Sequence, residues 1–205
     1  MVDTRWYLLV NGWAKSTPGL HGVAAWYAVD GVALFVLALL AAFWRTRRAS
    51  DRAMATALWA GVGTVVVVGL NQLFVAGVHR IRPYWVLAHV EVLVPRTHDY
   101  SFPSDHAVTA GAVAAGLWLV SRAVDGRALG RLALAGGIGA LLLAADRVYV
   151  GAHYPGDVVA GLFVGALLMM GSERAVRGPL TRLVTQLRAS RARRLVTTSV
   201  NPPAA

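Results

Sequence analysis

An arginine, a histidine and an aspartate follow one another closely in the second half of the chain. They are Arg147, His153 and Asp157, in the run Arg-Val-Tyr-Val-Gly-Ala-His-Tyr-Pro-Gly-Asp. A carboxylate four residues after a histidine can accept a ring N–H, which fixes the tautomer and leaves the other ring nitrogen free to attack. An arginine that stays charged suits the oxygens of a phosphate. The run therefore predicts nucleophilic catalysis on a phosphate group.

Two further polar blocks could complete such a site. Arg82 is a second fixed cation, and Ser104, Asp105 and His106 open an expected helix directly after a proline. The free N–H groups and the positive dipole end of a helix start attract an anion. We expect His106 to protonate the leaving oxygen.

Each of these residues has a simpler interpretation. A single arginine or histidine at a membrane surface is more often an interfacial anchor than a catalyst. The His153 and Asp157 pair could also be structural, or two metal ligands, but no third ligand is evident and Arg147 would repel a cation. The combined arrangement favours a metal-independent phosphate site.

The composition indicates a membrane protein. The 205 residues are 57% hydrophobic and only 15% charged, and the length suits a single domain. The net charge of +10 is expected to serve anionic lipids or an anionic substrate, with no nucleic-acid partner. There is no cysteine, which excludes disulfides and thiolate-bound metals.

The hydrophobic pattern predicts an all-α, integral membrane helical bundle. Residues 3–15 carry tryptophans at helical spacing in a run too short to span, so we expect an interfacial helix. About five longer apolar segments follow, each expected to cross the bilayer. They are residues 23–44, 53–77, 104–120, 132–148 and 155–173. The segment 79–103, with three prolines, is expected to be a loop or re-entrant element.

The basic residues predict the orientation. Two short loops and the C-terminal segment carry 14 of the 20 lysine and arginine residues. The positive-inside rule places them in the cytoplasm, so all three polar blocks face outside. We expect a multi-pass membrane protein with a cytoplasmic C-terminus. Residues 1–178 would form the membrane domain and residues 179–205 a basic tail, helical at first and disordered at its Thr/Ser/Pro end.

The three blocks, in their order and spacing, resemble the signature of the type-2 phosphatidic acid phosphatase superfamily. The matching residues are Arg82, Pro83, Pro103, Ser104, Asp105, His106, Arg147, His153 and Asp157. The resemblance implies metal-independent hydrolysis through a phosphohistidine and no cofactor. His153 would be the nucleophile, Asp157 its orienting partner and His106 the acid. The implied phosphate cradle is Arg82, Ser104, Asp105 and Arg147.

The sequence around the second block is more specific. The run Ser-Phe-Pro-Ser-Asp-His at 101–106, with Asp99 ahead of it and Asn71 before the first block, resembles the bacterial undecaprenyl-diphosphatase branch associated with bacitracin resistance. The resemblance covers roughly residues 1–172 and implies removal of the terminal phosphate from a polyprenyl diphosphate, so that the carrier lipid is recycled for peptidoglycan synthesis. The expected partners are this lipid substrate and the surrounding membrane lipids.

Two positions depart from the superfamily pattern. Val75 stands where the pattern has a lysine, and we expect Arg80 or His79 to supply the missing positive charge at the substrate. Asp146 replaces the serine that usually precedes Arg147. It either turns away to pair with an arginine or weakens phosphate binding.

Three other functions are compatible with parts of the pattern. A phosphatidate or phosphatidylglycerol-phosphate phosphatase would use the same cradle. A non-catalytic lipid transporter would need polar groups near the bilayer midplane, where the later segments are almost entirely apolar. Vanadium haloperoxidases share the signature, but those enzymes are soluble.

Overall fold

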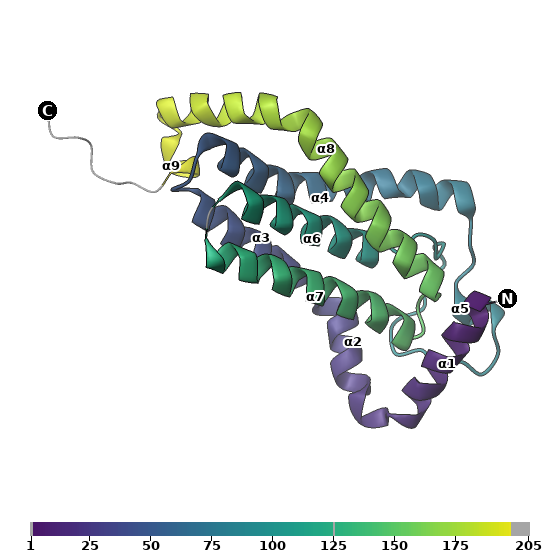
Figure 1. Cartoon of the computed structure of the whole chain (residues 1–205). Helices are drawn as coiled ribbons and strands as arrows, with labels where there is room; N and C mark the ends of the chain where they lie inside the picture. The colour runs from purple at the N-terminus through teal and green to yellow at the C-terminus, as the bar shows by residue number, and fades with distance from the viewer. Residues whose placement is uncertain (1, 125, 198–205) are drawn as a thin grey trace, which may run out of the picture.

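The protein is a bundle of helices, shown by a computed structural model that describes residues 2–124 and 126–197 (Figure 1). No strand occurs in this part of the chain. The helices are α1 (Val2–Ser16), η1 (Pro18–Leu20), α2 (His21–Asp30), α3 (Val32–Thr46), α4 (Asp51–Val78), α5 (Pro83–Val86), α6 (Asp105–Ala123), α7 (Arg127–Tyr149), α8 (Pro155–Ala189) and α9 (Arg193–Val196). The prediction of an all-α membrane bundle is confirmed.

Helix α6 lies at the centre and contacts α3, α4, α7 and α8. Small residues let these helices approach closely, as in other membrane bundles. A Cβ on Gly111 of α6 would overlap the carbonyl oxygen of Leu162, and one on Gly165 of α8 would overlap that of Val108. Since no side chain separates the two backbones here, α6 and α8 hold each other's N-terminal halves in fixed register.

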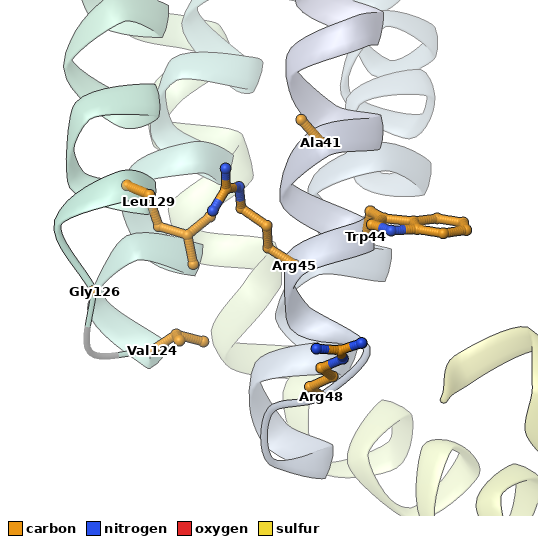
Figure 2. Close-up of a pocket in the computed structure, with 8 residues that line it drawn as sticks. Ala41, Trp44, Arg45, Arg48, Val124, Gly126 and Leu129 are labelled. Carbon is orange, nitrogen blue, oxygen red and sulfur yellow. The ribbon is translucent and has the colours of Figure 1, made fainter. Parts of the chain in front are cut away.

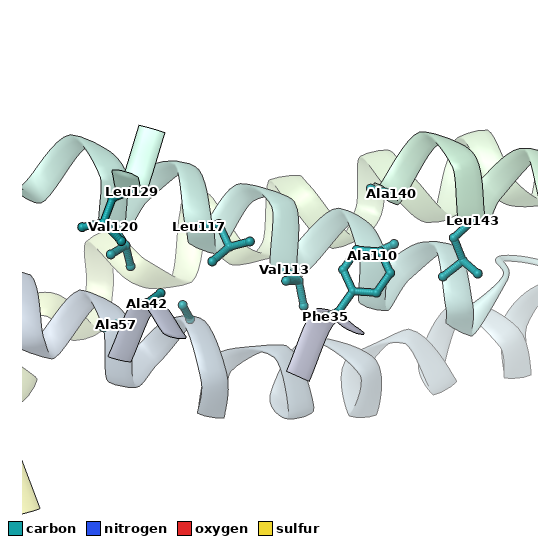
Figure 3. Close-up of a cluster of buried hydrophobic side chains, with 11 residues drawn as sticks. Phe35, Ala42, Ala57, Ala110, Val113, Leu117, Val120, Leu129, Ala140 and Leu143 are labelled. Atoms are coloured by element: carbon teal, nitrogen blue, oxygen red, sulfur yellow. The ribbon is translucent and has the colours of Figure 1, made fainter. Parts of the chain in front are cut away.

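The largest apolar cluster joins four helices (Figure 3). Phe35 of α3 points toward α6 and belongs to the same buried cluster as Val113, Leu117 and Leu143. This packing holds α3, α4, α6 and α7 together, so the helix ends that carry the polar blocks stand on a rigid bundle.

Three stretches are long and apolar enough to cross a membrane, judged over the described residues: 51–86, 127–149 and 155–189. A fourth span results if α2 and α3 count as one, although the pair is bent by 51° at a short break. Helix α6 is not in this set, because polar residues at both of its ends lower its mean hydropathy; 10 of its 19 residues are buried in the bundle. The count of five spans stays a prediction that includes α6.

The expected first span, residues 23–44, is interrupted at Gly31. Helix α2 ends at Asp30 and turns away from α3. As a result α2, η1 and α1 fold back toward the end of α7 and the start of α8 (Figure 1). A glycine at a break is a common cause of such a bend. Asp30 is exposed at this break.

Helix α1 has the two faces expected of an interfacial helix. Trp6, Leu9 and Trp13 are exposed on one side, with Trp6 59% accessible, while Tyr7 and Asn11 are buried on the other. The apolar side therefore suits the head-group region of a membrane.

Helix α8 continues across residue 178, where the membrane domain is expected to end, and that division stays a prediction. Helix α8 runs past the expected end of the fifth span at Glu173 and continues through Pro179 to Ala189. Arg188 then binds Asp51 at the start of α4, with 2.7 Å between Nη1 and Oδ1. The Thr/Ser/Pro end, residues 198–205, lies outside the described residues.

A cavity of about 640 Å³ opens between α3 and α7 at the end of the bundle opposite His153 (Figure 2). Arg45 and Arg48 line it together with Trp44 and Leu129. The cytoplasmic placement of this end stays a prediction from the positive-inside rule.

Candidate active site

Three segments far apart in sequence meet where α7 ends and α8 begins. The backbone N–H of Ser101 donates to the carbonyl of Arg80 at 2.8 Å, and that of Ser104 donates to the carbonyl of Asp157 at 3.2 Å. The structure therefore brings together the three polar blocks that the sequence pattern singled out.

His153 lies at the centre of this junction, with only 2% of its surface exposed. Its Nδ1 is 2.9 Å from the carbonyl oxygen of Ser101, and its Nε2 is 2.9 Å from Nη1 of Arg82. A carbonyl can only accept and a guanidinium can only donate. The ring is therefore neutral, with its proton on Nδ1 and a lone pair on Nε2.

The surroundings keep this ring unprotonated. Burial, together with the charges of Arg82 and Arg147, lowers the pKa of His153 to about 4, although Asp157 opposes the shift. A neutral imidazole at physiological pH is the form that can act as a nucleophile.

Asp157 is fully buried and its two oxygens are held by other groups. Oδ1 accepts from Arg80 at 2.7 Å, and Oδ2 accepts from the backbone N–H of Tyr154 at 2.9 Å. The distance from Oδ2 to Nδ1 of His153 is 3.7 Å. The expected direct hydrogen bond between this carboxylate and the ring is thus replaced by the Ser101 carbonyl, and Asp157 acts on the ring through its charge.

Arg82 is buried beside the histidine and fixed on both sides. Its Nη2 lies 2.8 Å from Oδ2 of Asp99, and its Nε lies 3.2 Å from Oδ1 of the same carboxylate. Nη1 also donates to the carbonyl of Ala152 at 3.1 Å. This two-point pairing orients the guanidinium so that Nη1 faces His153.

Arg147 and two serines leave buried polar atoms without a partner among the described residues. The arginine donates through Nη1 to the carbonyl of Ala28 at 3.1 Å, but its Nε has no acceptor. The hydroxyl oxygens of Ser101 and Ser104 are also unpaired. Ser104 is the residue that precedes α6, yet its hydroxyl does not cap the helix. Unpaired buried donors cost free energy, and together they fit an anion with several acceptor oxygens.

His106 stands in the first turn of α6 and is partly exposed. It is within electrostatic reach of His153, Arg82 and Arg147, and it makes no side-chain hydrogen bond or ion pair among the described residues. The ring is thus available to exchange a proton with a ligand held between the two arginines.

Asp105, which was expected in the phosphate cradle, contacts side chains of α4. Its Oδ1 accepts from Asn71 at 2.7 Å and from Gln72 at 3.0 Å. Asn71 also donates to the carbonyl of Pro103 at 3.3 Å. These contacts explain the polar pair inside the apolar helix α4, because they anchor the start of α6 to it.

The two residues expected to replace the lysine at Val75 both have partners within the protein. Arg80 is bound to Asp157 and to Asp3 of α1. His79 ends α4 in the left-handed conformation (φ 52°), is exposed, and packs edge-on against Tyr100. A contact of either side chain with the substrate stays a prediction.

Asp146 lines an apolar groove. One of its carboxylate oxygens is buried with no partner, and it is in no ion pair among the described residues. The expected arginine pairing is therefore not made. The described residues also contain no group of three or more histidine, cysteine or acidic side chains placed to hold a metal ion.

Comparison with known families agrees with this arrangement. The model of the PAP2 superfamily matches residues 56–177, which include all three polar blocks. The chain belongs to the PAP2 superfamily. The resemblance inferred from the three blocks is thereby confirmed, and with it the assignment as a phosphatase.

Several PAP2 relatives are similar over most of the chain. The undecaprenyl-diphosphatase of Sulfolobus acidocaldarius is 28% identical over 172 residues, which is 83% of this chain and 77% of that protein. Undecaprenyl-diphosphatase BcrC of Bacillus subtilis is 33% identical over 69% of this chain and 66% of its own length. The bacitracin transport permease protein BcrC of Bacillus licheniformis is 31% identical over 78% of this chain and 74% of its own length.

Two solved structures share the PAP2 fold. A transmembrane phosphatidylglycerolphosphate phosphatase from Bacillus subtilis superposes with a TM-score of 0.56 at 20% identity, covering 85% of this chain and 86% of that one. Aquifex aeolicus LpxE gives a TM-score of 0.56 at 22% identity, with 85% and 96% covered. These similarities establish the transmembrane helical fold.

Proposed function

We propose that this PAP2 protein removes the terminal phosphate of undecaprenyl diphosphate, or a similar polyprenyl diphosphate, through a phosphohistidine at His153. The observation that carries the proposal is the neutral, buried ring, with the lone pair of Nε2 directed at Nη1 of Arg82. A terminal phosphoryl group bound by Arg82 would be brought within reach of this lone pair.

In the first step Nε2 attacks the terminal phosphorus. An N–P bond forms while the bridging P–O bond breaks, and His106 gives a proton to the departing polyprenyl phosphate. Arg82, Arg147, the Ser104 hydroxyl and the start of α6 stabilise charge on the phosphoryl oxygens, which is the main requirement of phosphoryl transfer. Asp157 stabilises the positive charge that develops on the His153 ring.

In the second step water releases the phosphate. His106, now neutral, removes a proton from the water as its oxygen attacks phosphorus, and the N–P bond breaks. The products are inorganic phosphate and the His153 ring in its starting form. Each step uses groups of this chain alone.

A groove beside the site supports a lipid substrate. It has a volume of about 810 Å³ and lies between α1, α2, α7 and α8, with Pro155 and Val158 at the end nearest His153. Its walls are almost entirely apolar side chains, including Trp6 and Trp13 of the interfacial helix. A prenyl chain lying there would leave its diphosphate at the membrane surface.

The names of the relatives and the charge pattern support the biological setting. Two relatives are named undecaprenyl-diphosphatases, and the basic loops support an outward-facing site in a bacterial plasma membrane. There the enzyme would recycle the carrier lipid of the cell envelope, with the C-terminus in the cytoplasm.

Phosphate release by purified protein in lipid nanodiscs with excess chelator tests the proposal. Undecaprenyl diphosphate should be hydrolysed faster than phosphatidate or phosphatidylglycerol phosphate, and His153→Ala should reduce release to background. Equal rates for the wild-type protein and His153→Ala would reject it.

One relative is named a transport permease, which favours testing lipid transfer as a second candidate. Lipid movement that persists in a His106→Ala/His153→Ala double variant, together with no hydrolysis by the wild-type protein, would support transport in place of catalysis.

A further inference from the structure

Arg80 connects the catalytic pair to the interfacial helix. Its Nη1 donates to Oδ1 of Asp157 at 2.7 Å, and its Nη2 donates to Oδ2 of Asp3 in the first turn of α1. The guanidinium also lies over the ring of Tyr154, with 4.0 Å between its Cζ and the ring centroid. One cation is thus shared between a buried carboxylate and a carboxylate that comes from another part of the chain.

Asp3 holds the same helix start through its second oxygen. Oδ1 accepts from the backbone N–H of Gly156 at 2.9 Å, and Gly156 directly precedes Asp157. Asp3 therefore contacts the arginine that binds Asp157 and also the turn on which Asp157 stands. A displacement of α1 would move both.

Two more residues of α1, one and two turns after Asp3, also hydrogen-bond to backbone atoms in other parts of the chain. The hydroxyl of Tyr7 donates to the carbonyl of Gly151 at 3.2 Å, in the turn that leads to His153. Asn11 exchanges two hydrogen bonds with the backbone of Glu91, at 2.8 and 2.9 Å. The spacing of four residues puts all three polar side chains on one face of α1, and the exposed Trp6 and Trp13 lie on the neighbouring face.

We propose that Asp3 is a positioning residue for catalysis, acting through Arg80 on Asp157 and thereby on His153. By taking part of the arginine's charge, Asp3 leaves Asp157 negative toward the His153 ring, where positive charge develops on phosphorylation. The interfacial helix is then part of the catalytic apparatus in addition to a membrane anchor. This inference rests on the proposed function of His153.

The test is kinetic and uses the full-length protein in nanodiscs. Asp3→Asn should lower kcat between about 10-fold and 100-fold with little change in KM, because the substrate contacts are intact while the geometry of the nucleophile is not. Arg5→Gln, which removes an exposed charge from the same helix, should leave both constants unchanged. An Asp3→Asn enzyme with the wild-type kcat would overturn the proposal.

A double-mutant cycle shows whether Asp3 acts through Arg80. Arg80→Gln should lower kcat to a similar extent, and Asp3→Asn should then have little further effect. Independent, multiplicative losses would overturn the relay. Thermal unfolding of each variant identifies losses caused by misfolding, and Asp3→Glu should restore part of the activity if position and charge are what matter.

The pH titration of His153, followed by NMR, gives a readout that does not need turnover. Asp3→Asn removes a negative charge from the cluster of Arg80, Asp157, Arg82 and Arg147 around the ring, so the His153 titration should move to lower pH, and Arg5→Gln should not move it. No movement with Asp3→Asn would overturn the inference. Assays on p-nitrophenyl phosphate run alongside, so that failure on polyprenyl diphosphate alone counts against the proposed function and not against the relay.

Discussion

Nη1 of Arg82 lies 2.9 Å from Nε2 of His153, so a buried guanidinium contacts the atom that we propose as the nucleophile. Asp99 fixes the other edge of the same guanidinium. In the proposed mechanism this arrangement would bring a bound phosphoryl group to Nε2, and the guanidinium beside Nε2 disfavours a proton there.

Replacement of Arg82 should therefore affect both phosphoryl binding and the protonation of His153. Arg82→Gln is expected to lower kcat/KM by about 100-fold or more, because a preorganised donor to the phosphoryl oxygens is lost. Arg82→Lys keeps the charge but loses the two-point contact with Asp99, and should recover only part of the rate. Phosphate-release kinetics on the diphosphate lipid measure both variants. Wild-type activity in Arg82→Gln would contradict the assigned role.

The protonation of His153 is a second prediction. Because burial and the neighbouring arginines lower its pKa to about 4, the ring should remain neutral as the pH falls from 7 to 5, where an ordinary histidine with a pKa of about 6.5 becomes mostly charged. NMR of labelled histidine should show the Nδ1–H tautomer and a midpoint near 4, and Arg82→Gln should raise that midpoint. A midpoint near 6.5, or an Nε2–H tautomer, would contradict the geometry.

The role of His106 predicts a dependence on the leaving group. A general acid matters most when the departing oxygen is a poor leaving group, and its loss costs about 100-fold to 10,000-fold. His106→Ala should therefore impair hydrolysis of phosphatidate, which releases an alkoxide, much more than hydrolysis of p-nitrophenyl phosphate. An equal loss on both substrates would assign His106 to binding instead of proton transfer.

The apolar groove predicts discrimination by chain length. Ala145 lines the groove and is exposed, so Ala145→Trp should fill part of it. The variant should have a higher KM for undecaprenyl diphosphate and an unchanged rate on p-nitrophenyl phosphate, which has no chain. Leu134→Trp, on an exposed part of α7 away from the groove, is the matched control. Equal effects of the two tryptophans on KM would show that the chain lies elsewhere.

The sequence predicted the parts of this protein that depend on residue type and spacing. Apolar runs of helix length predicted the helical bundle, and the tryptophans at 6 and 13 predicted the interfacial helix. Two arginines, two histidines and an aspartate in three blocks predicted the site, because side chains that bind and attack phosphate belong to few residue types. The break at Gly31 was not predicted, since the apolar pattern continues across it.

Contacts made by the backbone or across long sequence distances could not be predicted. The acceptor for Nδ1 of His153 is a carbonyl, and every residue carries one, so the sequence favoured Asp157 instead. Arg80 was expected at the substrate because it is a cation close to Arg82, and its contacts with Asp3 and Asp157, each 77 residues away, could not be read from the sequence. Asp105 was expected in the cradle, and only the folded chain brings Asn71 to its carboxylate.

The central claim is that His153 becomes phosphorylated. The most direct measurement is rapid quenching of the enzyme with terminally ³²P-labelled undecaprenyl diphosphate, followed by mapping of the labelled peptide. We expect an acid-labile, base-stable phosphoryl group on His153, formed and consumed at rates consistent with turnover and absent in His153→Ala. Turnover by an enzyme in which label never appears on His153, or in which His153→Ala still hydrolyses the lipid at the wild-type rate, would contradict it.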